Sequence, residues 1–126
     1  MELTKELITD FIKKNQIELS PTQSKMSLPI INRIFKKMSA GLKFSGIKIE
    51  RNCICDGHHR YIASLFSNFP IERLPGIISP SVATIDWESV EFEYEDWDTP
   101  AKIKLLNEQD AVFNKISIEK IIDLLK

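Results

Sequence analysis

The chain has 126 residues, of which 43% are hydrophobic and 28% are charged, and its formal net charge is −1. This length and composition fit one globular domain that buries a core without disulfides or metals, and they exclude a disordered chain. No apolar run approaches the length of a membrane span, and the N-terminal residues lack the apolar core of a signal peptide, so we expect no contact with a membrane.

In chain order, the first predicted element is a helix over residues 4–15, because apolar residues recur there at helical spacing. A short strand over 17–19 is predicted next, and a Ser-Pro pair ends it. A second helix is predicted between Ser27, a typical N-cap residue, and Gly41, which supplies a left-handed stop. One face of this helix is apolar and the other carries lysines and an arginine.

Two strands are predicted over 44–50 and 53–55, with a turn between them. The second strand runs directly into Asp56-Gly57, and a helix over 58–69 follows. Pro70 is expected to end that helix, because the residue before a proline is disfavoured in helical conformation.

The last third of the chain is predicted to contain a strand over 77–78, a strand over 90–95 where apolar and acidic residues alternate, and two helices. Asp98-Thr99-Pro100 is typical of a helix start, and Ser117 is the expected cap of the final helix. This order of elements predicts an α+β fold, a compact single domain over 1–126 with a small mixed sheet and helices packed around it.

Cys53 and Cys55 are the two cysteines of the chain. Residues separated by one position on a strand seldom form a disulfide, and this pair lacks the second pair of ligands that a structural zinc site needs. We therefore expect free thiols in a reducing cytosol and a cytoplasmic protein.

The most informative motif is Cys55-Asp56-Gly57-His58-His59-Arg60-Tyr61, at the junction of a predicted strand and a predicted helix. A glycine turn at a helix start leaves backbone N–H groups unpaired, with the positive end of the helix dipole behind them. His58, His59 and Arg60 would complete an anion pocket, and phosphate is the most common biological anion. The alternative is that Asp56 caps the helix and the basic residues only cover the surface.

Charge is distributed unevenly around this motif. From Lys25 to Arg60 eight basic residues stand against two acids, whereas from Tyr61 to the end twelve acids stand against six bases. The predicted anion pocket therefore lies in the basic part of the chain, where the long-range field favours an anion.

The order of these features resembles the ParB/sulfiredoxin superfamily. The corresponding parts are a segment with Pro and Gln (residues 19–23), a helix that ends in glycine, a strand, a turn, and a strand that leads into Asp-Gly-His-His-Arg. The resemblance covers about residues 17–78. Residues 79–126, with an acidic strand and C-terminal helices, resemble nothing that we recognise.

The resemblance implies that the motif binds nucleotide phosphates at a helix N-terminus. His59 and Arg60 would contact the phosphates, Gly57 would permit the turn, and Asp56 would cap the turn or help to hold Mg²⁺. His58 stands where sulfiredoxins carry their redox-active cysteine, and a histidine cannot form the thiol intermediates of that reaction, so sulfiredoxin activity is not expected.

The Asp-Gly-His-His-Arg motif looks more like the motif of the branch that contains free serine kinases. Those kinases use an acidic residue in the first conserved segment to accept a hydroxyl proton. Gln23 matches that position and is expected in the nucleotide site, but an amide cannot act as a base. Glu18, close to it in sequence, is the alternative acid. His58 is a further candidate for acid–base catalysis, because the pKa of histidine lies near working pH.

The first hypothesis is a nucleotide-dependent enzyme that hydrolyses a nucleoside triphosphate or transfers its phosphoryl group to a small hydroxyl compound. A nucleoside triphosphate or diphosphate (ATP or ADP, or CTP) and Mg²⁺ would be the cofactors. Phosphoryl transfer needs mainly positioning and charge stabilisation, which His59, Arg60, Mg²⁺ and helix-end amides could supply. The alternative, which Gln23 favours, is a module that senses a nucleotide or docks a partner without chemistry.

Binding of nucleic acid is the third hypothesis, through the basic face of the second helix together with Lys43, Lys48 and Arg51. Partition proteins of the superfamily bind cytidine nucleotides and read DNA through a separate helical domain, which this chain is too short to contain. The acidic C-terminal half would also repel a phosphate backbone, so nucleic acid is the least favoured partner.

The acidic residues Glu91, Glu93 and Glu95 would share one face of the 90–95 strand, and a solvated face is the simplest interpretation. If that face binds something, the partner is cationic: the chain's own basic stretch, or a second copy in a homodimer. Trp87 and Trp97 flank this stretch, and both are expected to anchor it in the core.

Overall fold

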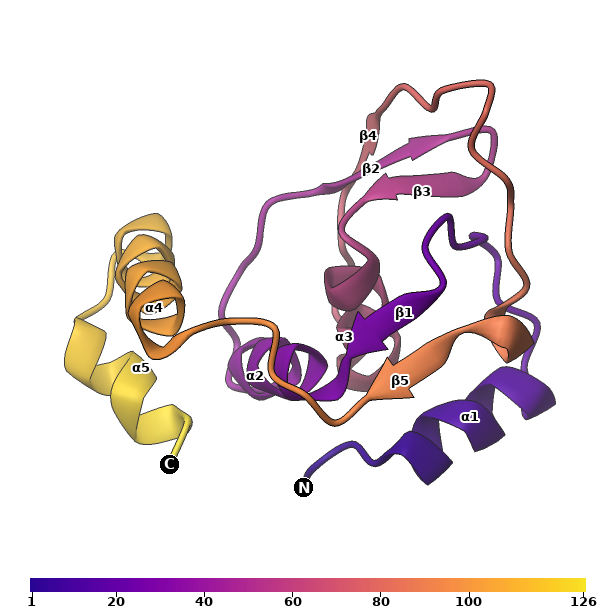
Figure 1. Cartoon of the computed structure of the whole chain (residues 1–126). Coiled ribbons are helices and arrows are strands. Elements are labelled where there is room, and N and C mark those ends of the chain that lie inside the picture. Colours follow the sequence, from indigo (N-terminus) through magenta and orange to yellow (C-terminus); the bar gives the residue numbers. More distant parts are fainter.

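Five helices and two small sheets make up the structure, a computed structural model that describes all residues from 1 to 126 (Figure 1). The predicted α+β class is confirmed. The helices are α1 (Lys5–Lys14), α2 (Leu28–Ser39), α3 (His58–Ser67), α4 (Pro100–Asn114) and α5 (Ile118–Leu124). The strands are β1 (Lys25–Ser27), β2 (Ile47–Glu50), β3 (Cys53–Asp56), β4 (Arg73–Pro75) and β5 (Glu91–Glu93), and a 3-10 turn, η1 (Trp87–Ser89), precedes β5.

One sheet has three strands in the order β3-β2-β4, and the other pairs β1 with β5. β2 runs antiparallel to β3 and parallel to β4, so the larger sheet is mixed. β1 and β5 are parallel, although more than sixty residues separate them in the chain. None of the helices combines the length and apolarity that crossing a bilayer requires.

The helix starts follow the predicted capping residues in most cases. Thr99 and Ser117 accept a hydrogen bond from a first-turn N–H of α4 and α5 respectively, and Thr4, which was not predicted as a cap, does the same for α1. Ser27 is also at the N-cap position of α2, but its hydroxyl group does not cap the helix. The Oγ atom instead donates to the carbonyl oxygen of Glu95, so it ties the start of α2 to the segment after β5.

Two predicted strands are wrong. Residues 17–19 form no strand, and the only ladder contact there is an isolated bridge between Ser20 and Cys53. Residues 77–78 are also irregular, and Ile77 is 92% exposed. The strand lies at Arg73–Pro75 instead, because that segment pairs with β2, and tertiary pairing outweighs the local apolar pattern.

Two further expectations need correction. α3 ends at Ser67, because Asn68 adopts a left-handed conformation with φ 55°, two residues before Pro70. Trp87 is buried and donates from Nε1 to the carbonyl oxygen of Leu19, as a core anchor should. Trp97 is not buried in the core, because its side chain lies against the ring of His59 with much of its surface exposed.

The helices α1, α2 and α3 and both sheets share one core of buried apolar side chains. The α4–α5 hairpin, drawn in orange and yellow in Figure 1, packs beside α2 and away from the sheets. It has a small core of its own, formed by Leu42, Ala111 and Ile121. The hairpin is therefore a separate layer that covers one side of α2.

Ion pairs fasten this layer to the basic face of α2. Arg33 makes two hydrogen bonds to the carboxylate of Asp96, at 2.6 and 2.9 Å, and a third to Asp98 at 3.1 Å. Lys37 lies 2.6 Å from Asp110 of α4. Part of the acidic C-terminal half thus binds the chain's own basic stretch, but these acids are not those of the face formed by Glu91, Glu93 and Glu95, which make no ion pair.

Candidate functional site

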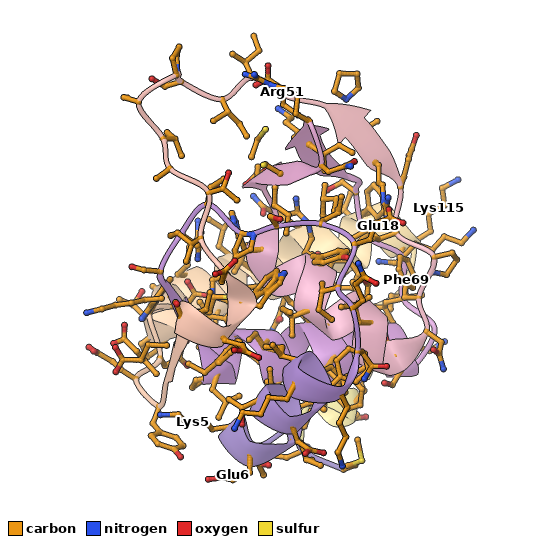
Figure 2. The ribbon with its side chains drawn as sticks, turned by 90° about the vertical axis from the view of Figure 1, so that its right-hand side faces the viewer. Lys5, Glu6, Glu18, Arg51, Phe69 and Lys115 are labelled. Atoms are coloured by element: carbon orange, nitrogen blue, oxygen red, sulfur yellow. The ribbon has the colours of Figure 1, made fainter.

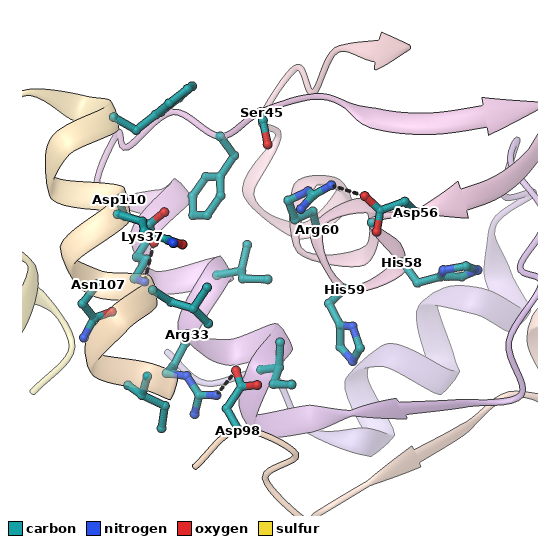
Figure 3. A pocket seen from close by; sticks show the side chains of 18 of the residues that line it. Arg33, Lys37, Ser45, Asp56, His58, His59, Arg60, Asp98, Asn107 and Asp110 are labelled. Carbon is teal, nitrogen blue, oxygen red and sulfur yellow. Dashed lines mark hydrogen bonds and ion pairs between the residues drawn. The ribbon is translucent and has the colours of Figure 1, made fainter. Parts of the chain in front are cut away.

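A cavity of about 500 Å³ lies between the start of α3, one face of α2, the segment before β2 and the inner face of α4 (Figure 3). This volume is in the range of small-molecule sites, roughly 300–1,000 Å³. Six of its lining residues are consecutive residues of the motif, from Cys55 to Arg60. The motif that the sequence singled out therefore faces this cavity.

The turn from β3 into α3 depends on Gly57. This residue has φ 102° and φ values of this kind are strained for residues with a side chain. An added Cβ would lie 2.6 Å from Cγ2 of Ile47 and 2.9 Å from Nη2 of Arg60. Only glycine fits here, so the turn places the start of α3 at the cavity wall.

No side chain caps α3. The alternative that Asp56 caps this helix is wrong, because its carboxylate points to Arg60 instead, with Oδ2 at 3.4 Å from Nη2. The N–H groups of the first turn have no partners within a helix, and the dipole makes this end positive. An anion in the cavity would meet these groups directly.

Arg60 is held loosely. Its Nη2 atom lies 3.4 Å from both the carbonyl oxygen of Gly46 and the carboxylate of Asp56, which is at the long end of hydrogen-bond distances. Its Nε atom is buried and has no hydrogen-bond partner. A buried donor without a partner is costly, about 1–3 kcal/mol, so this guanidinium group is suited to an acceptor that the protein itself does not supply.

The two histidines accept hydrogen bonds from backbone N–H groups and carry no positive charge. The N–H of Thr22 donates to Nε2 of His58 and the N–H of Ser27 donates to Nε2 of His59, both at 3.0 Å. Burial lowers the pKa of each ring to about 4. Each imidazole is therefore neutral at pH 7 and carries its proton on Nδ1.

This result changes the predicted cluster of cations. Arg60 is the one charged member of the trio, and the rings of His58 and His59 can offer only a neutral Nδ1–H to a ligand. The predicted acid–base role of His58 gains no support, because its pKa lies far below working pH and its Nε2 atom is already occupied.

The segment with Pro and Gln lies beside the motif. Thr22 donates from Oγ1 to the carbonyl oxygen of Ile54 at 2.6 Å, in addition to its backbone contact with His58. Gln23 lines the cavity, and its Nε2 atom donates to the carbonyl oxygen of Lys25. The structure thus brings Gln23 together with Asp56, Gly57, His58, His59 and Arg60.

Glu18 does not join them. It lies outside the cavity, where its carboxylate forms an ion pair with Arg73 of β4 (Figure 2). The predicted substitution of Glu18 for the missing acid at Gln23 therefore has no geometric support.

Asp56 is the residue that could coordinate a magnesium ion, and its side chain is 66% exposed at the cavity edge. No group of three or more His, Cys, Asp or Glu side chains is placed to hold a metal ion. Mg²⁺ is commonly held by one or two carboxylates together with substrate phosphates and water. Asp56 fits that arrangement, in which the ligand brings most of the oxygens.

The wall formed by α4 was not foreseen from the sequence. Ile103, Leu106, Asn107, Asp110 and Phe113 of this helix all line the cavity. The one local signal is Asn107, a polar residue that interrupts an apolar pattern and is only 8% exposed in the structure. Sequence spacing could not show that α4 folds back onto α2.

The basic residues of α2 are engaged in ion pairs within the chain. Arg33 and Lys37 are paired with Asp96, Asp98 and Asp110, and Lys36 is paired with Glu2. Hydrogen bonds from Arg33 hold the pKa of Asp96 below its ordinary value. These pairs would compete with nucleic acid for the helix considered in the third hypothesis.

No protein-family model, no curated protein and no solved structure matches the chain. The resemblance to the ParB/sulfiredoxin superfamily therefore depends on the motif and on the order of the elements around it.

Proposed function

We propose that the chain is a ParB/sulfiredoxin-like protein that binds a nucleoside di- or triphosphate, such as ADP, ATP or CTP, with its phosphates at the N-terminus of α3. The observation that carries this proposal is the buried Nε of Arg60, which has no partner and lies beside an uncapped helix start. Both features favour an anionic acceptor, and Arg60 and the first residues of α3 are among the residues that line the cavity.

Binding without chemistry is the function that the geometry supports best. Gln23 stands in place of an acid, and the carboxylates of Asp98 and Asp110 are paired with Arg33 and Lys37. Burial lowers the pKa of His58 to about 4 and its Nε2 atom is occupied by the N–H of Thr22, so this ring is not placed to accept a hydroxyl proton at working pH. A nucleotide-sensing or partner-docking module is consistent with this arrangement.

Mg²⁺-dependent hydrolysis or phosphoryl transfer to a small hydroxyl compound is the second candidate, and the exposed carboxylate of Asp56 favours it. This carboxylate lies 3.4 Å from Nη2 of Arg60, so a metal ion held there would be close to phosphates bound by Arg60. Mg²⁺ would neutralise charge on those phosphates when bound, while Arg60 and the helix-end amides would orient them.

Isothermal titration calorimetry with ATP, ADP and CTP, with and without Mg²⁺, tests the proposal. Arg60→Ala should weaken binding by about tenfold or more, because charge-assisted hydrogen bonds are lost. Arg51→Ala is the matched control, since Arg51 is exposed at the outer tip of the β2–β3 hairpin (Figure 2). Equal affinity in the two variants, or no nucleotide binding to the wild type, would refute the proposal.

Product formation separates the two candidates. Release of phosphate from ATP or CTP in the presence of Mg²⁺, lost in Arg60→Ala, would favour the enzyme. Binding without turnover would favour the sensing module.

A further inference from the structure

We infer that α4 supplies the specificity of this site: Asn107 accepts a hydrogen bond from the amino group of an adenine or cytosine base, which lies against an apolar wall of α2 and α4. This inference rests on the proposed function, because it assumes that the phosphates of the same ligand are bound at α3. It assigns a role to the C-terminal layer, which the superfamily resemblance does not cover.

Two buried side chains at this cavity each carry a polar atom without a hydrogen-bond partner. In the whole chain, only two buried side-chain nitrogen or oxygen atoms lack a hydrogen-bond partner, Nε of Arg60 and Oδ1 of Asn107. Both residues line the same cavity, one from α3 and the other from α4 (Figure 3). Buried polar atoms are nearly always paired, so two exceptions at one cavity indicate a ligand that pairs with both.

The chemistry of the two atoms is opposite. Nε of Arg60 can only donate, so it requires an acceptor, and the charge of the guanidinium group favours an anion. Oδ1 of Asn107 can only accept, so it requires an N–H or O–H group. The ligand is therefore anionic at one end and carries a hydrogen-bond donor at the other.

The α4 end of the cavity is not a second anion site. Its two cations, Arg33 and Lys37, are already neutralised by Asp96, Asp98 and Asp110. Lys37 is almost fully buried, with 5% of its side chain exposed. Arg60 has the weaker pairing, with Asp56 at 3.4 Å and an unpaired Nε atom, so a phosphate group would bind there, which orients the ligand with its uncharged part towards α4.

Most of the rest of this wall is apolar, although Gln109 of α4 also lines it. The apolar residues are Ile30 and Ile34 of α2, Phe44 of the loop between α2 and β2, and Ile103, Leu106 and Phe113 of α4. Such side chains favour a flat, weakly hydrated ring over a sugar or a charged group. Adenine and cytosine are rings of this kind and carry an exocyclic amino group, whereas hypoxanthine and uracil present a carbonyl oxygen at that position.

Calorimetry with two matched ligand pairs tests the inference on the wild-type protein: ADP against IDP, and CDP against UDP. Pyrophosphate serves as the probe for the phosphate end alone. We expect at least one amino-bearing base to bind about tenfold more tightly than its oxo counterpart, because a carbonyl oxygen would face Oδ1 of Asn107. Equal affinity within both pairs would overturn the inference without requiring any variant.

Asn107→Leu provides the second arm. It should abolish the preference for the amino-bearing base and leave the affinity for pyrophosphate unchanged, whereas Arg60→Ala should weaken pyrophosphate and nucleotides alike. Circular dichroism checks that each variant is folded. An unchanged preference in Asn107→Leu, together with weak binding to Arg60→Ala, would refute the role of Asn107 and keep the proposed function. If neither pyrophosphate nor any nucleotide binds, both the role of Asn107 and the proposed function are refuted.

Discussion

Nζ of Lys37 lies 2.6 Å from Oδ2 of Asp110, and the lysine side chain is only 5% exposed. This pair joins the basic helix α2 to the acidic C-terminal layer, and both residues line the cavity. It is therefore a structural link that holds α4 in place as one wall of the candidate site.

Removing one partner of this pair should be costly. Asp110→Ala leaves the ammonium group of Lys37 buried without compensation, and we expect a loss of about 3 kcal/mol in the free energy of unfolding. The double variant Lys37→Met/Asp110→Leu should regain most of it, since no charge is then buried. Urea denaturation measures both. The matched control is Lys36→Met, whose exposed partner Glu2 predicts a loss below about 1 kcal/mol. Equal losses in Asp110→Ala and the control would contradict the prediction.

Alanine substitutions at two glycines with similar backbone conformation distinguish the cost of backbone strain from the cost of a steric clash. Gly57 has φ 102° and Gly41 has φ 93°, but an added Cβ meets nothing within 4 Å at Gly41, whereas at Gly57 it meets Ile47 and Arg60. Gly41→Ala should cost about 1 kcal/mol from the backbone alone. Gly57→Ala should cost roughly 2 kcal/mol or more, and it should also weaken nucleotide binding because Arg60 is displaced. Thermal unfolding and calorimetry check the two effects, and similar losses of stability at both positions would argue against a clash.

The stability of the protein should fall as the pH drops below neutrality. Burial lowers the pKa of His58 and His59 from 6.5 to about 4, so the unfolded state binds more protons than the folded state between these two values. Their contribution is complete above pH 6.5 and is lost as the pH falls towards 4. For the buried His58 the loss is on the order of 2 kcal/mol near pH 4.5.

Urea denaturation at a series of pH values measures this dependence. His58→Gln keeps an acceptor for the N–H of Thr22 but cannot take up a proton, so it should flatten the pH dependence between 6.5 and 4. A variant with the same pH dependence as the wild type would show that His58 does not titrate as its burial implies.

The carboxylate of Asp56 competes with a ligand for Arg60. Without Mg²⁺, Asp56→Asn should therefore increase nucleotide affinity by roughly two- to fivefold, the range expected for an exposed ion pair. With Mg²⁺, the same variant should lose any enhancement that the metal gives the wild type, because its one motif carboxylate is gone. Titrations with and without Mg²⁺ check both the gain in affinity and the loss of the metal's effect. If Mg²⁺ still increases the nucleotide affinity of Asp56→Asn, Asp56 does not hold the metal.

The local signals in the sequence were sufficient for the helices and for the turn at the candidate site. Thr99 and Ser117 begin helices as predicted, because capping depends on residues within one turn of each other. Gly57 likewise leads a strand into a helix, since its positive φ is a property of that one residue.

The charge state of the site could not be predicted in this way. His58 and His59 read as cations in the sequence, but burial against the N–H groups of Thr22 and Ser27 makes them neutral. The pKa of a side chain depends on solvent exclusion by distant segments, which residue spacing does not report.

The sequence by itself determined the α+β class, the order of most elements and the motif that faces the cavity. Only the tertiary structure decided that β1 pairs with β5, that the acids after β5 neutralise Arg33, and that α4 brings Asn107 to the same cavity as Arg60. The physical reason is range: capping and turn preferences act between neighbouring residues, whereas strand pairing, ion pairs and burial depend on which distant segments meet.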